Sequence, residues 1–507
     1  MQKTDAYRGL RDISLSKEKL EALARETAAR SVRMDKRALK RSGVFDISGD
    51  RRALIALNAR LDQLAEMGVE LPIGAKSLMD AFYVIEKTAA ALEASFDAKR
   101  RMPMVPVEAE GERVNLPRIY SIAIDIAGRR SGRVDTAALE AYLNAYQAVR
   151  PLTMRELSLL LSMLKLALIR LIRLEGEDMC ERAEQYAMAE DAANRLCCMP
   201  RGSQRIKALI EKLDISSRPA MAERLMTLLL ERDSYELIQS ISQSISFGGN
   251  AAEELLARDR SLAELSAKRT LEATASLRYI DSIDAQSFFE KHSRVEQILR
   301  EDSVYPLMDA ASRDYYREQL EKTASRCGAG EAVAARMALE LSAKASGKAA
   351  HIGYYLTEWE GQRELLSALR PDKTFVYADE DARLAIALCT QGLIMLILVL
   401  LCSASGWIAA LVSIIPAWCI ARELTVRMAA MLHGPKRIPR LALENGIPDD
   451  AGVLVSVPVL ITGERDIEQA VEQLETHYLA NSYKNCYFAV IGDFLLSTDL
   501  SSIYARL

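Results

Sequence analysis

The sequence predicts a mainly α-helical protein with a two-helix transmembrane hairpin, followed by a short α/β unit of the strand-helix-strand (βαβ) type. Apolar residues recur at spacings of three and four over most of the first 370 residues, which is the period of an amphipathic helix. No charged residue occurs from Leu384 to Ala421, a run of 38 residues. After that run, two uncharged stretches rich in β-branched residues flank one helical stretch, which favours a βαβ unit.

The composition argues against several classes of protein. The chain has 507 residues, 27% charged and 50% hydrophobic, which is enough for about two to four folded domains. Basic and acidic residues number 66 and 70, so no positive excess supports nucleic-acid binding as the main role. The eight cysteines form no CxxC pair and the four histidines are scattered. We therefore expect reduced thiols in a cytosolic setting, rather than a zinc site or a disulfide framework.

Residues 1–74 form the first predicted segment, which is helical. The N-terminus is charged and has no apolar core of signal-peptide length, so we expect it to stay in the cytoplasm. Ser16 precedes a stretch of strong helix formers and is a candidate N-cap. The stretch "RRALIALNARLDQLAEM" then sets four leucines at spacings of three and four, which predicts a helix packed against another helix. These are Leu54, Leu57, Leu61 and Leu64.

Residues 75–382 are predicted to form a cytosolic helical region. Asp135 and Thr136 stand where the N-cap of one of its helices belongs. The stretch "RRMPMVPVEAEGERVNLPRIY" contains three prolines and a glycine, and we interpret it as a connector. From residue 203 to residue 370 no strand alternation of useful length occurs.

One stretch of this region, "PLTMRELSLLLSMLKLALIRLIRLEGED", is apolar enough to suggest a membrane span. Its longest charge-free run, Leu157 to Leu164, is short, whereas a span needs about 20 predominantly apolar residues. Three cationic residues, Lys165, Arg170 and Arg173, follow that run. We therefore predict a helix that is buried on most sides within the protein.

Residues 383–422 are predicted to form the transmembrane hairpin. A single helix through the 38 uncharged residues would be about 57 Å long, whereas the hydrocarbon core is about 30 Å thick. Two shorter helices joined at "SASG" fit that thickness, with Trp407 and Trp418 at the interfaces. Basic residues flank both ends, so the positive-inside rule makes that side cytoplasmic. These residues are Arg370, Lys373, Arg383, Arg422, Arg427, Lys436, Arg437 and Arg440.

Residues 423–450 are a basic juxtamembrane linker, and residues 451–507 are the α/β unit. Its first strand, "VLVSVPVL", and its second, "YFAVIGD", are separated by an amphipathic helical stretch. Asp493 closes the second strand, at the edge where parallel sheets contact ligands. It is either a ligand-binding acid or an ordinary turn or cap residue. The absence of a Walker A or GxGxxG motif argues against a P-loop or a dinucleotide site.

Several stretches together resemble one family, the bacterial cyclic β-1,2-glucan synthases, in their N-terminal glucosyltransferase region. The stretch "RIPRLALENGIPDDAGVLVSVPVLITGERDIEQAVEQLETHYLANSYKNCYFAVIGDF" is similar to that family's linker and first strands. Upstream, "AYLNAYQAVRPLTMRELSLLLSMLKLALIRLIRL", "SFFEKHSRVEQILREDSVYPLMDAASRDYYREQLEK" and "HIGYYLTEWEGQRELL" also match, in family order. The matches extend over about residues 75 to 494.

The resemblance implies a GT-A-like glycosyltransferase domain, of which residues 451–507 are the truncated start. Family members act in the inner membrane, with the transferase module in the cytoplasm, and build β-1,2-glucan from UDP-glucose. By position, the resemblance assigns nucleotide-sugar binding to Pro458, Leu460, Ile461, Thr462 and Asp493. It also implies a Mg²⁺ or Mn²⁺ ion on the diphosphate and a carboxylate general base, but the matching residues have no counterpart in this chain.

Two departures from the family lie beside the candidate acid. Gly492 replaces a threonine, and the sequence after Asp493 lacks the expected continuation, although Asp499 could stand in for one of its acids. We therefore expect the N-terminal portion of a membrane glucosyltransferase that is inactive alone because the catalytic half is absent. The alternative is a non-enzymatic membrane-anchored helical scaffold of a glucan-synthesis complex. A third hypothesis is a soluble all-α regulatory protein with a buried hairpin. The partners expected are UDP-glucose, glucan and inner-membrane lipids, and not nucleic acid.

Overall fold

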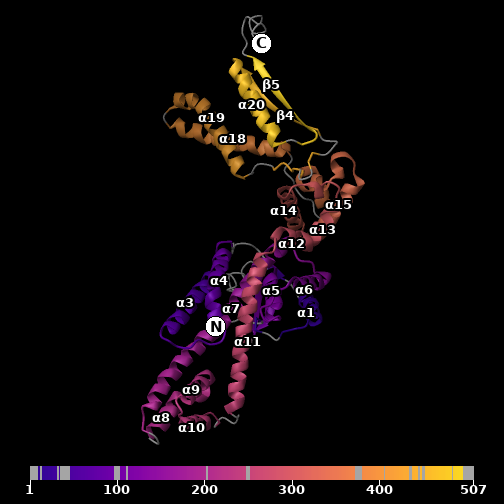
Figure 1. The fold of residues 1–507 in the computed structure, drawn as a ribbon. Helices are drawn as coiled ribbons and strands as arrows, with labels where there is room; N and C mark the ends of the chain where they lie inside the picture. Colours follow the sequence, from indigo (N-terminus) through magenta and orange to yellow (C-terminus); the bar gives the residue numbers. More distant parts are fainter. Residues whose placement is uncertain are drawn as a thin grey trace. The chain divides into compact units, whose positions relative to one another are not determined.

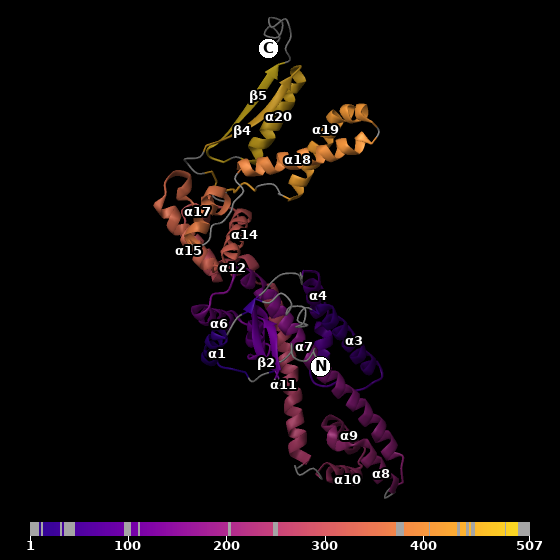
Figure 2. The ribbon, with the colours of Figure 1, turned by 180° about the vertical axis from the view of Figure 1, so that it is seen from behind.

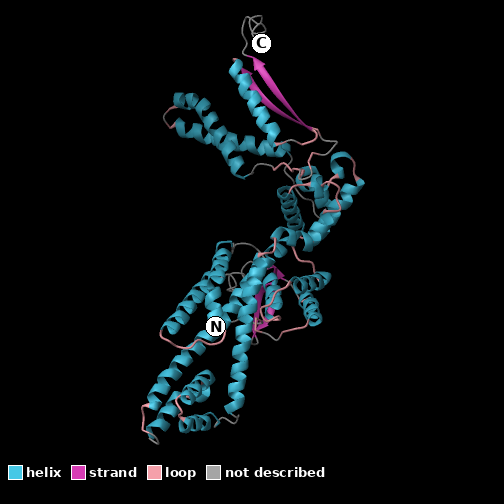
Figure 3. Ribbon diagram, in the orientation of Figure 1, coloured by secondary structure: helices cyan, strands magenta, loops and turns pink. Residues whose placement is uncertain are grey.

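The computed structural model divides the chain into two compact units, residues 1–297 and 298–507, and each is described by itself. Helices predominate in both units, and the described strands form two small sheets (Figure 3). The structure describes residues 10–11, 14–30, 33–34, 46–95, 103–109, 112–200, 204–246, 252–371, 380–404, 406–432, 437–442, 446–447, 452–481 and 483–494.

The first unit is organised around one long helix, α7 (Met154–Cys197). This helix contacts α3, α4, α5, α9 and α11, and Figure 1 shows α7 and α11 side by side. The other helices of the unit are α1 (Lys17–Ala29), α3 (Ile47–Glu66), α4 (Ala75–Ser95), α5 (Arg118–Gly128), α6 (Thr136–Val149), α8 (Gln204–Leu213), α9 (Pro219–Glu231), α10 (Tyr235–Ser246), α11 (Ala252–Asp281), α12 (Ala285–His292) and α13 (Arg294–Leu299), the last of which reaches the boundary between the units.

Helix α7 begins with a capping box, in which the Thr153 hydroxyl accepts from the Glu156 amide (3.3 Å) and the Glu156 carboxylate accepts from the Thr153 amide (3.0 Å). The same carboxylate forms a buried ion pair with Arg118 of α5. The prediction of a helix buried on most sides is confirmed, because nearly every apolar residue from Leu157 to Ile172 is buried.

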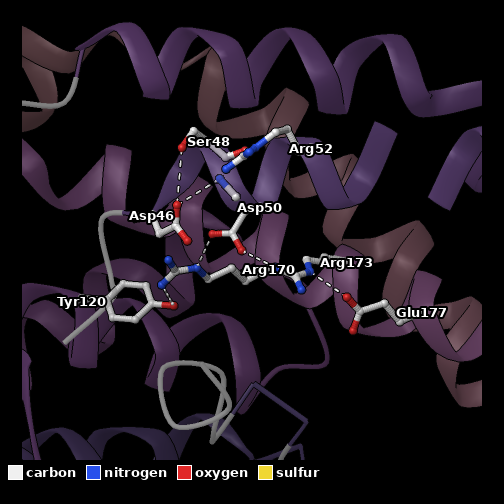
Figure 4. A network of polar contacts seen from close by, with 9 residues as sticks. Asp46, Ser48, Asp50, Arg52, Tyr120, Arg170, Arg173 and Glu177 are labelled. Atoms are coloured by element: carbon white, nitrogen blue, oxygen red, sulfur yellow. Dashed lines mark hydrogen bonds and ion pairs between the residues drawn. The ribbon is translucent and has the colours of Figure 1, made fainter. Parts of the chain in front are cut away.

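The cationic residues of this apolar helix find partners within the unit. Lys165 pairs with Asp281 of α11 at 2.5 Å. Arg170, with a side chain only 1% exposed, donates through Nε to Asp50 of α3 (2.9 Å) and through Nη1 to the Tyr120 hydroxyl (2.9 Å), as Figure 4 shows. Arg173 binds the other Asp50 oxygen at 2.7 Å. Because buried charges are tolerated when they are paired, these contacts explain how a helix with three cationic residues can be buried within the protein.

The other helical predictions for this unit are largely confirmed. The leucine stripe of α3, Leu54 to Leu64, is buried in the main hydrophobic core. Asp135 caps α6 by accepting from the Ala138 amide at 2.9 Å. Ser16 occupies the N-cap position of α1, but its side chain makes no capping hydrogen bond.

The connector predicted after residue 100 is wrong, because the structure has a β-hairpin there. Strand β2 (Pro103–Ala109) pairs antiparallel with β3 (Glu112–Pro117), and the short β1 (Arg33–Met34) pairs with the start of β2. This sheet packs against α5, and its strand β2 is seen in the view from behind (Figure 2). The prediction was wrong because prolines usually argue against a strand, whereas these three occupy positions where a strand tolerates proline. Pro103 begins β2, Pro117 ends β3, and Pro106 lies beyond the residues that pair with β1.

The second unit begins with a group of mutually contacting helices, α14 to α17. Gly328 ends the first of them in the left-handed conformation (φ 65°), which is a common C-terminal stop. These helices are α14 (Ala310–Cys327), α15 (Glu331–Lys344), α16 (Ile352–Thr357) and α17 (Trp359–Leu369).

The uncharged run forms two helices that contact each other, α18 (Glu380–Ser403) and α19 (Trp407–Leu432). In α19, the segment Trp407–Met428 is long and apolar enough to cross a membrane, whereas the apolar part of α18, Ala387–Ser403, is shorter. Large apolar side chains are exposed along α19, including Trp407 (77%) and Ile415 (76%), which does not fit a hairpin buried in a soluble core. The transmembrane hairpin itself stays a prediction.

The α/β unit consists of β4 (Val453–Ile461), α20 (Glu464–Ala480) and β5 (Cys486–Phe494). The strands pair in parallel, as the βαβ prediction requires. Helix α20 contacts both strands and covers one face of this two-stranded sheet (Figure 1). The amphipathic stretch predicted here packs only partly, since Ile467 and Leu474 of α20 are half-buried while Val471 and Leu479 are exposed.

Candidate functional site

The candidate site is the carboxyl edge of the β4–β5 sheet, where both strands end at the same level. The register pairs Pro458 with Ile491, Leu460 with Asp493 and Ile461 with Phe494. The structure therefore brings four of the five sequence-predicted site residues onto the last rungs of one parallel ladder. Ligands of open α/β sheets bind outside this edge.

The pleat divides these residues between the two faces of the sheet. Along β4, half-buried residues alternate with exposed ones from Val455 to Ile461, and α20 covers the half-buried set. Pro458, Leu460 and Asp493 are exposed and lie on the face opposite α20, whereas Ile461 lies on the helix side. The candidate acid thus ends an apolar face that no described helix covers.

Thr462 belongs to the turn between β4 and α20, and its polar groups are already engaged. The Asp466 carboxylate accepts from the Thr462 amide (2.7 Å), the Thr462 hydroxyl (2.5 Å) and the Gly463 amide (3.1 Å). These hydrogen bonds, that of the Thr462 side chain foremost, lower the pKa of Asp466. Since a carboxylate already occupies this helix N-terminus, the turn fixes the edge of the sheet and does not form an open anion site.

Gly492 has a packing reason that the sequence did not reveal. A Cβ atom at this position would lie 2.5 Å from the Cδ1 atom of Ile461, so any side chain there would have to displace Ile461. The glycine is therefore matched to the isoleucine of β4, and it lets β5 approach closely just before Asp493.

The basic linker after α19 docks on the helical part of its own unit. Met308 and Leu441 form an antiparallel bridge, with hydrogen bonds from the Asp309 amide to the Arg440 carbonyl (3.0 Å) and from the Ala442 amide to the Leu307 carbonyl (2.7 Å). The Arg440 amide also donates to the hydroxyl of Ser312, in the first turn of α14 (2.8 Å). This strap, residues 437–442, was missed by sequence reasoning because a six-residue segment carries no periodic signal.

A buried polar cluster explains part of the "HIGYYL" motif. The Asp302 carboxylate accepts from the amides of Val304 (2.9 Å), Tyr305 (2.9 Å) and Ile352 (3.1 Å), and it bonds to Nδ1 of His351 (2.9 Å). Burial alone would raise the pKa of Asp302, but the hydrogen bonds, led by that of His351, outweigh it and lower the pKa to about 2.

The other ring nitrogen of this histidine, His351 Nε2, lies 3.1 Å from the Tyr316 hydroxyl. A Cβ atom at Gly353 would lie 2.1 Å from that hydroxyl, so the motif needs glycine there for room. Because the Asp302 carboxylate has several bonds within the fold, we interpret this cluster as structural.

The described residues offer no metal centre and no disulfide. No group of three or more His, Cys, Asp or Glu side chains that could hold a metal occurs among them. No disulfide joins the cysteines of the described residues, and the reduced, cytosolic setting stays a prediction. The Mg²⁺ or Mn²⁺ ion that the resemblance implies therefore finds no ligand set in the described part of the chain.

A parallel βαβ unit with an acid at the carboxyl end of its second strand is the kind of site that α/β ligand-binding proteins use. No protein-family model matches the chain. The curated cyclic β-(1,2)-glucan synthase NdvB of Rhizobium meliloti is 25% identical to it over 458 residues, which cover 84% of this chain and 16% of the relative. The chain thus spans about one sixth of the length of that protein. The resemblance indicated by the motifs is confirmed at the level of a relative of this enzyme family.

Proposed function

We propose that this chain is the membrane-attached N-terminal portion of a glucosyltransferase that builds β-1,2-linked glucan from UDP-glucose. The observation that carries the proposal is the similarity to a cyclic β-(1,2)-glucan synthase along 84% of the chain. The parallel register, which sets Leu460 opposite Asp493 at the ligand edge of the sheet, supports it.

In this proposal the carboxyl edge holds the uridine side of the sugar nucleotide. The Asp493 carboxylate accepts hydrogen bonds from hydroxyl or N–H groups of the nucleoside, and Pro458 and Leu460 provide apolar contact beside it. The diphosphate lies away from the α20 N-terminus, since Asp466 already binds the amides there. The described residues contain no group of ligands that could hold a divalent cation beside the diphosphate.

The α/β unit is proposed to need further polypeptide before it can transfer glucose. The face opposite α20 exposes Leu454 (61%), Tyr487 (62%) and Ile491 (56%), and an isolated two-stranded sheet is marginally stable. A mostly parallel sheet has both faces covered, so this apolar face requires additional elements. We therefore propose that the chain alone forms no glucan.

The membrane attachment is proposed to be a hairpin of α18 and α19 in the bacterial inner membrane. Arg370 precedes the hairpin, and Arg422 and Arg427 lie in the C-terminal part of its second helix, which favours a cytoplasmic location for both ends of the hairpin. The strap then brings the chain back to α14, on the same proposed cytoplasmic side. Anionic lipids are the expected partners of the flanking cations.

A scaffold role without catalysis is the second candidate. The lack of a metal-ligand group among the described residues favours it, since the proposed leaving group carries a diphosphate charge. The two candidates differ in one measurable property, because a pure scaffold has no reason to bind a sugar nucleotide at the sheet edge.

The test uses membranes that contain the full chain. A photoreactive UDP-glucose analogue is expected to label residues 453–494 saturably. Asp493→Asn should reduce labelling at least about tenfold, because hydrogen bonds to a charged group contribute about 1.5–3 kcal/mol. Glu475→Gln removes one charge from a late turn of α20 and should leave labelling unchanged. Labelling that is equal in both variants would contradict the assignment of the edge, and glucan formation from labelled UDP-glucose with Mg²⁺ would contradict the proposed inactivity.

A further inference from the structure

Three large apolar side chains are exposed around the strap, residues 437–442. Ile438 is 82% exposed and Leu441 is 43% exposed. Leu307, whose carbonyl accepts from the Ala442 amide, is 59% exposed. The four peptide units from Ile438 to Ala442 span at most about 14 Å, so the three side chains share one small area of the surface. Exposed apolar side chains that gather in this way mark an interaction surface.

The antiparallel bridge fixes which side chains of this apolar patch point outward. Successive side chains of paired segments point to opposite faces. Met308 and Leu441 are bridge partners, and Met308 is buried, so their common face is turned toward the helical group. Leu307 and Arg440, one position along in each segment, therefore lie on the opposite face, and both are exposed. The outward face thus combines an apolar side chain with a cation.

Two arginines of the strap, Arg437 and Arg440, are exposed beside the apolar patch. The acids of α14 that interact with them have other partners as well. Asp309 accepts from the Ser312 amide (2.8 Å), and Glu318 binds a lysine of its own helix (2.8 Å). These bonds foremost, and then the charges of Arg440 and Arg437, lower the pKa of Asp309 and of Glu318. Apolar side chains beside exposed arginines suit the headgroup region of an anionic membrane.

The chain leads from α19 directly to the strap. Helix α19 ends at Leu432, and the five peptide units from there to Arg437 span at most about 18 Å. The segment Trp407–Met428 of this helix is long and apolar enough to cross a membrane. A surface tethered by so short a connection meets the lipid at a high effective concentration.

We propose that the apolar patch is a further membrane contact, which lies in the headgroup region of an anionic lipid surface. The inference rests on the proposed attachment of α19 to the membrane, and it names a second element of the chain that touches lipid. The strap is bound to residues 307–309 through backbone hydrogen bonds and to Ser312 through the Arg440 amide. A strap held at the lipid surface therefore holds the N-terminal end of α14 there too.

The experiment uses the full chain in vesicles of equal parts phosphatidylcholine and phosphatidylglycerol. Phenylalanine replaces the native tryptophans, Trp359, Trp407 and Trp418, and Ile438→Trp introduces one reporter in the apolar patch. Lipids brominated near the headgroup end of their acyl chains quench a tryptophan that they contact. We expect them to lower the reporter fluorescence at least about twofold, because interfacial apolar groups lie about 5–10 Å deep.

The matched control is Val333→Trp in the same tryptophan-free chain. Val333 is 59% exposed, and it lies in the first turn of α15, directly after the turn that ends α14. Helix α14 has 18 residues and is about 27 Å long, so the control lies at the end of α14 opposite the strap. Its fluorescence should change little.

A second variant tests the patch by charge. Leu307→Glu, added to Ile438→Trp, places a carboxylate in the patch and should restore most of the fluorescence, whereas Val333→Glu in the same chain should not. Hydrogen exchange of the α14 amides checks that each variant keeps the fold of the helical group.

The failures of the two proposals are distinguishable by flotation. A chain that does not float with the vesicles would contradict the membrane attachment itself, and this inference with it. A chain that floats while the reporter at position 438 is not quenched would overturn the lipid contact alone and assign the patch to a protein partner. Equal quenching at positions 438 and 333 would overturn it as well.

Discussion

The buried contact between Asp50 and Arg170 gives a sharp prediction for the first unit. The Asp50 side chain is 2% exposed and the Arg170 side chain 1% exposed, and their atoms Oδ2 and Nε lie 2.9 Å apart. Burial alone would lower the pKa of Arg170, but Tyr120 and Asp50 more than offset it, so the pKa is raised and the guanidinium stays charged. Asp50→Asn therefore leaves a buried positive charge without its carboxylate.

The expected loss of stability follows from the geometry. Removing one partner of a buried ion pair costs about 3–5 kcal/mol. The asparagine retains a carbonyl oxygen and the volume of the aspartate, and the Tyr120 hydroxyl still bonds Arg170, so we expect about 3 kcal/mol, the low end. This corresponds to about a 150-fold change in the unfolding equilibrium.

Hydrogen exchange of the α3 and α7 amides is the appropriate assay. Tryptophan fluorescence cannot report on this unit, because the three tryptophans, Trp359, Trp407 and Trp418, all lie in the second one. We expect exchange about 100-fold faster in Asp50→Asn than in the wild type. The control Glu184→Gln breaks a pair with Arg60 whose side chains are 47% and 42% exposed, and it should cost less than about 1 kcal/mol.

A double variant separates the buried charge from other effects. Adding Arg170→Gln to Asp50→Asn removes the uncompensated cation, so part of the lost stability should return. If Asp50→Asn lowers the free energy of unfolding by no more than Glu184→Gln does, the buried pair of Asp50 and Arg170 does not stabilise the first unit.

Three further predictions concern the second unit. The fold lowers the pKa of Asp302 to about 2, so its ionised carboxylate stabilises the fold by about 2 kcal/mol. This stabilisation is fully present above about pH 4 and is lost as the pH falls toward 2, and Asp302→Asn should abolish this acid dependence. Unfolding is measured by the fluorescence of Trp359, with the other tryptophans replaced by phenylalanine. Ala442→Pro removes the amide N–H that donates to the Leu307 carbonyl (2.7 Å). Trypsin should therefore cleave after Arg440 at least several-fold faster in this variant than in Ala442→Gly. Equal cleavage rates would contradict the docking of the strap on residues 307–312. Ile415→Arg places a charge in α19 at a cost of about 2.5–3.5 kcal/mol for membrane insertion, so alkaline carbonate should extract more of this variant than of Ile415→Leu if the helix spans the membrane.

The helices and the βαβ order could be predicted because they rest on local patterns. The leucines of α3, the cap at Asp135 and the largely apolar β4 and β5 stretches each carry a period or a boundary signal within a few residues. The three-stranded sheet could not be predicted in the same way. Its prolines are unfavourable in most strands, and only the observed pairing shows that they occupy permitted positions.

The sequence could not indicate the contacts between residues that are far apart along the chain. Asp50 and Arg170 are 120 residues apart, and the strap joins residues 437–442 to residues 307–312, so no spacing rule connects them. The edge of the α/β unit is an intermediate case. The resemblance predicted that Thr462 and Asp493 bind the nucleotide sugar. In the structure the Thr462 hydroxyl donates to the Asp466 carboxylate and thereby stabilises the turn between β4 and α20.

The most direct test of the proposed glucosyltransferase role is hydrogen exchange of the full chain with and without UDP-glucose. We expect slower exchange at the ends of β4 and β5, at residues 460–463 and 492–494, with no change at the opposite ends of these strands, near Val453 and Cys486. The effect should be lost in Asp493→Asn and retained in Glu475→Gln. Protection that is absent, or that persists unchanged in Asp493→Asn, would contradict the account.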